Sequence, residues 1–341
     1  MTCLALVSDD SAAKKRKPPP LYWGAWIGWQ LTGTEAPYDM NAVSKFQSLV
    51  GKGLSLVEWS QAFSDCRSSP CQFFDFPAAD LQNVRQYGAI PVLSWASSSI
   101  PNYVNQPDFQ LSDVIAGRYD GHIRSWASAA RAWGHPFFLR FNWEMNGDWF
   151  PWGEATNGNQ PGQSVAAWRH VHDIFTSVGA TNATWVWCPL AEIKKNTVRG
   201  LRAVYPGDGY VDWTCLDGYN WGTTPENPHP WRSFNKIFRK DYLSITTKIA
   251  RKKPMMLGEI GSHSGGGNKT AWIRAMFRKV RTDYRKVRAL IWFNAFDRTI
   301  NWPVETSPST LAAFRRGVGK PNYKPNIYGN ISARPIPRPR R

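Results

Sequence analysis

Eight short apolar runs, separated by stretches with helical periodicity, are the feature that most constrains the fold of this chain. The runs cover residues 21–27, 55–59, 90–95, 137–141, 184–188, 215–219, 255–258 and 290–293. Between them, apolar residues recur at helical spacing, as in residues 164–178 and 269–284. Strands that alternate with helices predict βα units around a parallel sheet, and eight strands can close such a sheet into a barrel. We therefore expect an α/β fold in which residues 21–316 form a single catalytic (β/α)8 TIM barrel.

The two ends of the chain differ in composition from this central region. Residues 1–20 are polar and basic and end in three prolines, which predicts a disordered basic leader. Its apolar stretch is too short for the core of a signal peptide. Residues 317–341 are rich in proline and arginine and lack helical periodicity, so we expect a basic C-terminal tail that either wraps the barrel or is loose.

The formal net charge of +17 allows several classes of anionic partner, including nucleic acid and acidic polymers. No nucleic-acid-binding motif accompanies the basic residues, so we expect no nucleic-acid partner. No run of 18 apolar residues occurs, so we expect no membrane span. The remaining hypothesis for the charge is adhesion to acidic cell-wall polymers, and we expect the protein to act as a monomer.

Five cysteines bear on the compartment in which the protein works. Cys66 and Cys71 lie close together in a loop-like run, and Cys188 and Cys215 lie at the ends of two expected strands. We predict two disulfides from these pairs and a free Cys3. Disulfides form in oxidising compartments, so we expect a secreted, extracellular protein.

Polar and aromatic residues gather where the expected strands end. In a barrel of this kind the chemistry lies at the carboxyl ends of the strands, so these side chains should converge. They are Glu58, Trp59, Trp95, the segment 140–144, Trp187, Tyr219, Glu259 and Trp292.

Glu144 is the first candidate catalytic residue, because aromatic residues surround it in the sequence. An apolar run ends in Arg140 and Asn142, Glu144 follows, and Trp143, Trp149, Phe150 and Trp152 lie nearby. A carboxyl group walled by indoles is desolvated, which raises its pKa. A general acid for glycoside cleavage needs such a raised pKa. The alternative is a structural glutamate paired with Arg140.

Glu259 is the second candidate, because it follows the short buried run at residues 255–258 and precedes a glycine-rich loop. A carboxylate in that position is expected to point into the site, although a surface glutamate before a turn is the alternative. Tyr219 could donate its hydroxyl to Glu259 and keep that group ionised. Trp292 could form the floor under the sugar being cleaved.

These residues resemble those of glycoside hydrolase family 26, which contains β-mannanases and some mixed-linkage β-glucanases. The segment from Glu144 to Trp152 resembles the acid/base motif of the family, and residues 258–262 resemble its nucleophile strand. Asp217-Gly218-Tyr219 is similar to its strand-six motif. Trp149 matches the tryptophan beside the acid, and Trp292 the platform on strand eight. Many mannanases of the family have histidine where this chain has Trp143, which affects substrate specificity more than mechanism.

The resemblance implies an endo-acting hydrolase that retains anomeric configuration, with Glu144 as acid/base and Glu259 as nucleophile. Trp149, Trp292, Trp95 and Trp152 are then expected to bind sugar rings, and Asn142 and Arg140 to hydrogen-bond the sugar or orient the acid. We expect no metal ion and no organic cofactor. The leading substrate is β-1,4-mannan, followed by β-1,3-1,4-glucan and β-xylan. A carbohydrate-binding barrel without catalysis is the alternative from another class.

Overall fold

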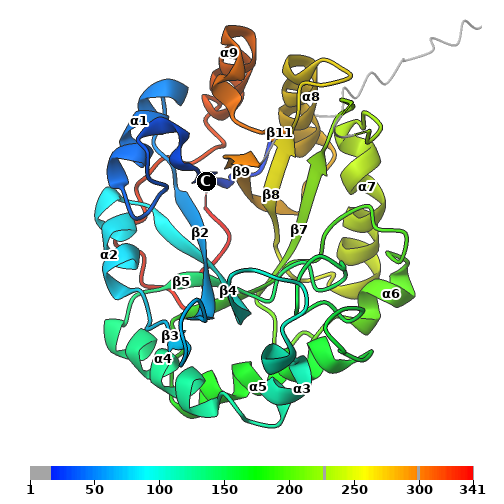
Figure 1. Ribbon diagram of the computed structural model, residues 1–341. Coiled ribbons are helices and arrows are strands. Elements are labelled where there is room, and N and C mark those ends of the chain that lie inside the picture. The colour runs from blue at the N-terminus through cyan, green and yellow to red at the C-terminus, as the bar shows by residue number, and fades with distance from the viewer. Residues whose placement is uncertain (1–16, 226–227, 298–299, 341) are drawn as a thin grey trace, which may run out of the picture.

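The computed structural model describes residues 17–225, 228–297 and 300–340, and its central element is a closed parallel barrel (Figure 1). The strands pair in the order β1-β9-β8-β7-β6-β5-β4-β2, and β1 also pairs with β2 to close the ring. Their bounds are β1 Tyr22–Ile27, β2 Leu56–Asp65, β4 Ile90–Ile100, β5 Phe137–Phe141, β6 Ala183–Trp187, β7 Trp213–Asn220, β8 Met255–Ser262 and β9 Val287–Asn294. The predicted (β/α)8 barrel is confirmed.

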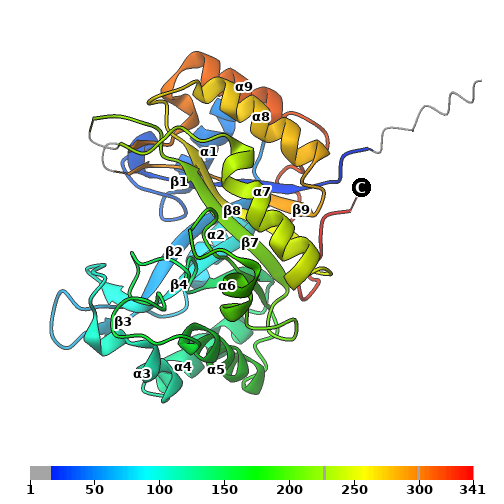
Figure 2. The ribbon, with the colours of Figure 1, turned by 90° about the vertical axis from the view of Figure 1, so that its right-hand side faces the viewer.

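Helices surround this barrel, as the side view shows (Figure 2). The α-helices are α1 Met40–Val50, α2 Ala78–Tyr87, α3 Leu111–Ile115, α4 Asp120–Trp133, α5 Gln163–Ser177, α6 Val198–Ala203, α7 Phe234–Ser244, α8 Lys269–Thr282 and α9 Pro308–Val318. Short 3-10 or π turns are η1 Trp29–Leu31, η2 Pro107–Phe109, η3 Ile245–Ile249 and η4 Val304–Thr306. Strands β5, β6 and β8 are buried along their whole length, because side chains fill the barrel and helices cover its outer surface.

Closure of the barrel depends on a glycine at the seam between β1 and β2. Gly24 pairs with Leu56 in the parallel register of these strands. A Cβ on Gly24 would lie 2.1 Å from the carbonyl oxygen of Leu56, so a larger residue would push the two strands apart. Glycine is required here for close approach of the backbones.

Both predicted disulfides are present. Cys66–Cys71 lies at the turn between β2 and the short antiparallel strand β3 (Gln72–Phe73). Cys188–Cys215 joins the end of β6 to β7, inside the barrel wall. Cys3 lies outside the described residues. None of the helices in the described part of the chain has the length and apolar character needed to cross a membrane.

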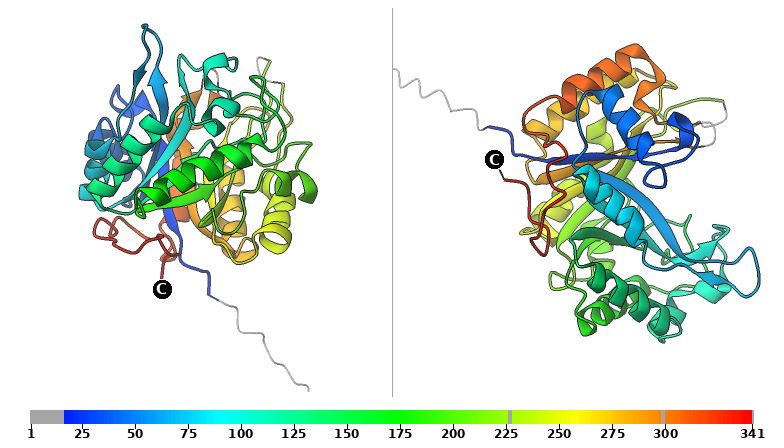
Figure 3. Two further views of the ribbon diagram at one scale, coloured as in Figure 1. Left: turned by 90° about the horizontal axis from the view of Figure 1, so that it is seen from below. Right: turned by 90° about the vertical axis from the view of Figure 1, so that its left-hand side faces the viewer.

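The C-terminal tail lies against the barrel, which is one of the two arrangements that its composition allows. Helix α9 ends at Val318, two residues beyond the predicted boundary, and the chain then crosses the amino-terminal ends of the strands (Figure 3). Tyr323 and Ile336 are buried there, and the indole of Trp213 donates to the carbonyl oxygen of Ile336 at 2.8 Å. The tail therefore covers the end of the barrel opposite the carboxyl ends of the strands. Most of the predicted leader lies outside the described residues, but Pro19 is already buried.

Candidate active site

Glu144 is placed by a tight turn directly after β5. Asn142 and Glu144 both adopt positive φ angles, 43° and 53°, which are uncommon for residues other than glycine. Backbone hydrogen bonds hold this turn, because the N–H of Asn142 donates to Trp95 and the N–H of Glu144 donates to Cys188. Strained backbone of this kind persists only where its surroundings fix it, and it concentrates at functional sites.

Glu144 is 6% exposed, and its carboxyl group accepts a hydrogen bond of 2.6 Å from the indole N–H of Trp149. Burial raises the pKa of Glu144 to about 8, and the nearby charge of Glu259 acts in the same direction. The Trp149 hydrogen bond and the charge of Arg140 oppose this rise in pKa. Glu144 therefore holds a proton near neutral pH, as a general acid must.

Glu259 lies near the end of β8, where the pairing with β7 and β9 shifts register. Tyr219, on β7, donates its hydroxyl to one oxygen of Glu259, and Arg140 Nη1 donates to the other at 3.0 Å. Both contacts hold the carboxyl group of Glu259 in one orientation. The predicted contact between Tyr219 and Glu259 is present.

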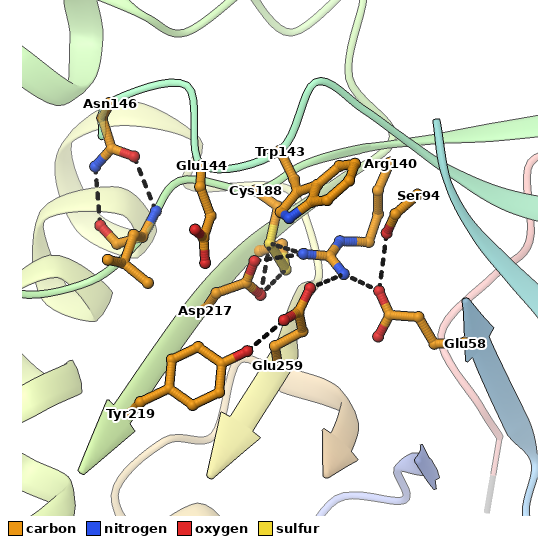
Figure 4. Close-up of polar contacts among 12 residues, drawn as sticks. Glu58, Ser94, Arg140, Trp143, Glu144, Asn146, Cys188, Asp217, Tyr219 and Glu259 are labelled. Carbon is orange, nitrogen blue, oxygen red and sulfur yellow. Dashed lines mark hydrogen bonds and ion pairs between the residues drawn. A yellow bond between two sulfur atoms is a disulfide. The ribbon is translucent and has the colours of Figure 1, made fainter. Parts of the chain in front are cut away.

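The two glutamates meet at the mouth of the barrel (Figure 4). Oxygens of Glu144, Asp217 and Glu259 lie within 4.8 Å of one another. Retaining glycosidases hold their two carboxyl groups about 5–5.5 Å apart, whereas inverting enzymes need about 6.5–9.5 Å to admit a water molecule. The arrangement therefore fits direct attack by one carboxylate with proton donation by the other.

Arg140 is the only cation that the described residues place among these carboxylates, and its side chain is fully buried. Its guanidinium contacts Glu58 and Asp217 as well as Glu259, and Ser94 donates to Glu58 at 3.0 Å (Figure 4). Arg140 is thus buried beneath the site and contacts the nucleophile candidate. These ion pairs take the place of the expected contact of Arg140 with the sugar or the acid, and no pattern in the sequence indicates that Glu58 and Asp217 hold Arg140.

The same carboxylates can be considered as metal ligands. By spacing, Glu144, Asp217 and Glu259 could hold a cation. However, the guanidinium of Arg140 already contacts both Asp217 and Glu259, and it supplies the positive charge that a metal ion would bring. Cys188 and Cys215 also lie near Asp217, but they are joined in a disulfide and offer no thiolate.

Three tryptophans predicted to bind sugar are buried elsewhere. Trp95 stacks on Trp126 of α4 with ring centroids 4.2 Å apart. Trp292 packs against α8 and α9, and its indole donates to the carbonyl oxygen of Trp302. Trp152 is 1% exposed and stacks on Phe150. The predictions for Trp95 and Trp292 are wrong because both side chains point from the barrel wall into the helix layer. Trp152 is too buried to stack on a sugar ring, and its indole donates to the carbonyl oxygen of Trp143.

Other aromatic side chains are better placed than these three to contact a sugar at the site. Trp149 is 38% exposed beside the acid, and Trp143 lies with its ring centroid 5.9 Å from the Arg140 guanidinium carbon. Phe293 and Trp302 lie 5.9 and 5.0 Å from the Tyr219 ring. Neighbouring residues on a strand point to opposite faces, so the burial of Trp292 among helices turns Phe293 toward the barrel. Alternation along β9 identifies Phe293 only once Trp292 is known to face the helices.

Asn142 stabilises the turn that carries Glu144. Its side-chain oxygen accepts from the backbone N–H of Ser97 at 2.8 Å, and its amide donates to the Ser97 hydroxyl at 2.8 Å. With both ends of the amide engaged and 5% exposure, Asn142 fixes the end of β5 against β4. Its predicted contact with the sugar remains a prediction.

Comparison with known proteins agrees with this geometry. Residues 85–264 match the model of glycosyl hydrolase family 26. Endoglucanase H of Acetivibrio thermocellus is 35% identical over 319 residues, which are 92% of this chain and 32% of that protein. Mannan endo-1,4-beta-mannosidase A and B of Caldalkalibacillus mannanilyticus is 32% identical over 152 residues, 41% of this chain and 25% of that protein. The chain thus spans about a third or less of the length of these relatives.

Solved structures share the fold. A modular endo-beta-1,4-mannanase from Cellulomonas fimi has a TM-score of 0.68 at 18% identity, covering 94% of this chain and 76% of that one. The catalytic domain of the GH26 endo-beta-1,4-mannanase from Bacillus sp. JAMB-750 has a TM-score of 0.67 at 20% identity, covering 92% and 91%.

Proposed function

The chain belongs to glycosyl hydrolase family 26, and from this premise we propose that it is an endo-acting glycoside hydrolase that cleaves β-1,4-linked polysaccharide with retention. The observation that carries the proposal is the pair Glu144 and Glu259, whose carboxyl oxygens approach within 4.8 Å at the mouth of the barrel. That separation suits direct attack on the anomeric carbon and leaves no room for an intervening water.

Glu259 acts as the nucleophile in this proposal. The Tyr219 hydroxyl and the Arg140 guanidinium each hold one of its oxygens, so the carboxyl group is fixed in one orientation. In the first step a Glu259 oxygen bonds to the anomeric carbon while the glycosidic bond breaks. Glu144 gives its proton to the departing sugar oxygen, which leaves as a hydroxyl group.

In the second step Glu144, now a carboxylate, takes a proton from water as that water attacks the anomeric carbon. The bond to Glu259 breaks, and both glutamates return to their starting protonation states. The same residue serves as acid and then base, so its pKa must allow both roles near the working pH. The raised pKa of Glu144, about 8, fits a group that begins the cycle protonated.

The leading substrate is β-mannan, and mixed-linkage β-1,3-1,4-glucan is the second candidate. The mannan assignment draws on a relative named as a mannan endo-1,4-beta-mannosidase. The glucan candidate draws on the endoglucanase that aligns over 92% of this chain, and on Trp143, where many mannanases of the family have histidine. Trp149, exposed beside Glu144, is the side chain best placed to stack on a sugar ring.

A reducing-sugar assay on mannan, barley β-glucan and xylan tests this proposal and separates the substrates. We expect rapid release of oligosaccharides from one of the first two, with a fall in viscosity that precedes the rise in reducing ends. Proton NMR of the first product should show the β-anomer before mutarotation. Activity on none of the three polymers, or an initial α-anomer, would contradict the proposal.

Secretion and action as a monomer are also part of the proposal. The disulfides Cys66–Cys71 and Cys188–Cys215 fit an oxidising compartment. Size-exclusion chromatography with light scattering tests the monomer, which should elute with a mass near 38.7 kDa.

A further inference from the structure

A basic groove of about 840 Å³ lies on the flank of the barrel, between α8 and α9. Its floor is apolar and is made by Phe277, Ala313 and Gly317. A Cβ on Gly317 would lie 2.1 Å from the Phe277 ring, so glycine lets α9 pack closely on α8 at this point. Figure 2 shows the two helices side by side on the outside of the molecule.

The walls of the groove carry only positive charge. Arg274, Arg278 and Arg281 recur at intervals of four and three along α8, which is the spacing of one helix face. The remaining cations that line it are Arg285, Arg316, Lys320 and Lys17. No aspartate or glutamate is among its described lining residues, and none of these seven cations forms an ion pair within the described part of the chain.

The like charges that line this groove repel one another, and a bound polyanion would reduce that repulsion. We propose that this groove binds an acidic polysaccharide through carboxylates that the arginines hold. Arginine presents a planar fork that matches a carboxylate in two parallel hydrogen bonds, and five of the seven cations are arginine. Single-stranded nucleic acid is the less suitable occupant, because its binding sites rely on exposed aromatic rings for base stacking. The aromatic ring lining this groove, Phe277, is only 5% exposed.

The position of the groove separates this binding from catalysis. The glutamates lie at the mouth of the barrel, whereas the groove lies on its outer flank and includes Lys17 and Lys320 near the amino-terminal ends of the strands. A charged polymer could therefore hold the protein while the mouth remains open to a neutral chain. The inference does not depend on which neutral polysaccharide is cleaved.

Affinity electrophoresis of the full chain in native gels containing polygalacturonate tests the proposal. The test variant is Arg278→Glu with Arg316→Glu, two exposed groove residues. The control is Arg124→Glu with Arg131→Glu on α4, which changes the net charge equally on the opposite side of the barrel (Figures 1 and 2). We expect polygalacturonate to retard the wild type and the control, and the test variant to bind about tenfold or more weakly, because each lost charged hydrogen bond costs about one order of magnitude.

Three outcomes would overturn the proposal: no retardation of the wild type, an equal loss of binding in both variants, or tighter binding to polyuridylate than to polygalacturonate. Equal loss would mean general attraction to a basic protein, and preference for the RNA would mean a nucleic-acid site. Hydrolysis of soluble neutral substrate, measured in parallel, should be unchanged in the test variant, which shows that the barrel is folded. The wild type should not be retarded by dextran, a neutral polymer.

Discussion

The indole N–H of Trp149 lies 2.6 Å from an oxygen of Glu144, so a side chain exposed at the mouth of the barrel also governs the proton affinity of the acid. This hydrogen bond favours the charged carboxylate and lowers the pKa of Glu144, against the larger effect of burial, which raises it to about 8. Trp149, which we propose stacks on a sugar ring, thereby also affects the acid strength of Glu144.

The alkaline limb of the pH profile should follow the pKa of Glu144. Glu144 is active as an acid only while protonated, so kcat/KM should fall as pH rises through about 8. Trp149→Phe removes a hydrogen bond to the charged form, which raises the pKa and should move this limb to higher pH. The position of the limb is the readout, because loss of the indole also lowers kcat/KM at every pH. A limb that moves to lower pH in Trp149→Phe would contradict the assignment.

Substitution of Glu144 and substitution of Glu259 should have different effects on substrates that differ in their leaving group. Glu144→Ala should lose about 10²- to 10⁴-fold in polysaccharide hydrolysis, because the departing sugar needs a proton. The same variant should still release dinitrophenolate from an activated aryl glycoside in a burst, since that leaving group needs none, and azide should accelerate later turnover. Glu259→Ala should be inactive on both substrates while its thermal unfolding stays close to that of the wild type. Near-normal hydrolysis by Glu259→Ala would refute its role.

Tyr219→Phe should reduce kcat with little change in KM. The variant removes the hydroxyl that donates to Glu259 and keeps the ring that packs against Trp302. Loss of a hydrogen bond to a charged group costs about 1.5–3 kcal/mol, which corresponds to about 10- to 100-fold in rate if it is expressed in the transition state. Steady-state kinetics and thermal unfolding of the variant distinguish an effect of Tyr219 on catalysis from an effect on stability. A lower melting temperature with unchanged kcat would make Tyr219 a structural residue.

Arg140→Met should destabilise the fold by about 3–5 kcal/mol, because it leaves the carboxyl groups of Glu58, Asp217 and Glu259 buried without their cation. This loss in the free energy of unfolding should depend on pH. Burial and the neighbouring glutamates already raise the pKa of Asp217, and removal of the guanidinium raises it further. The folded variant then binds more protons than the unfolded chain, so its stability falls as pH rises. Urea unfolding at pH 5 and pH 8 should show the smaller deficit at pH 5, and a deficit independent of pH would count against this explanation.

The barrel and its two glutamates were predictable from sequence because both depend on the order of apolar runs. Glu144 and Glu259 follow the fourth and seventh of those runs, and the carboxyl ends of parallel strands meet at one end of the barrel. The ends of the strands were less predictable. Strand β4 continues through Ser97, Ser98 and Ser99 to Ile100, where its polar composition hides the extended conformation.

Whether each tryptophan points into the barrel or toward the helices was not predictable, because barrel strands are apolar on both faces. In a strand buried on both sides, composition does not indicate which residues point inward. Trp95 and Trp292 therefore looked like site residues by position, although they face the helices. The cluster around Arg140 was missed for a different reason. Glu58, Asp217 and Arg140 come from three separate strands, and only the closed barrel brings them together.

The tail that crosses the amino-terminal ends of the strands has a practical consequence. Tyr22 donates to the carbonyl oxygen of Pro337 at 3.0 Å, which anchors the last described residues against that end of the barrel. A bead or electrode coupled to the chain at residue 340 would therefore be attached behind the molecule, and immobilised copies would keep their catalytic openings turned toward the solution.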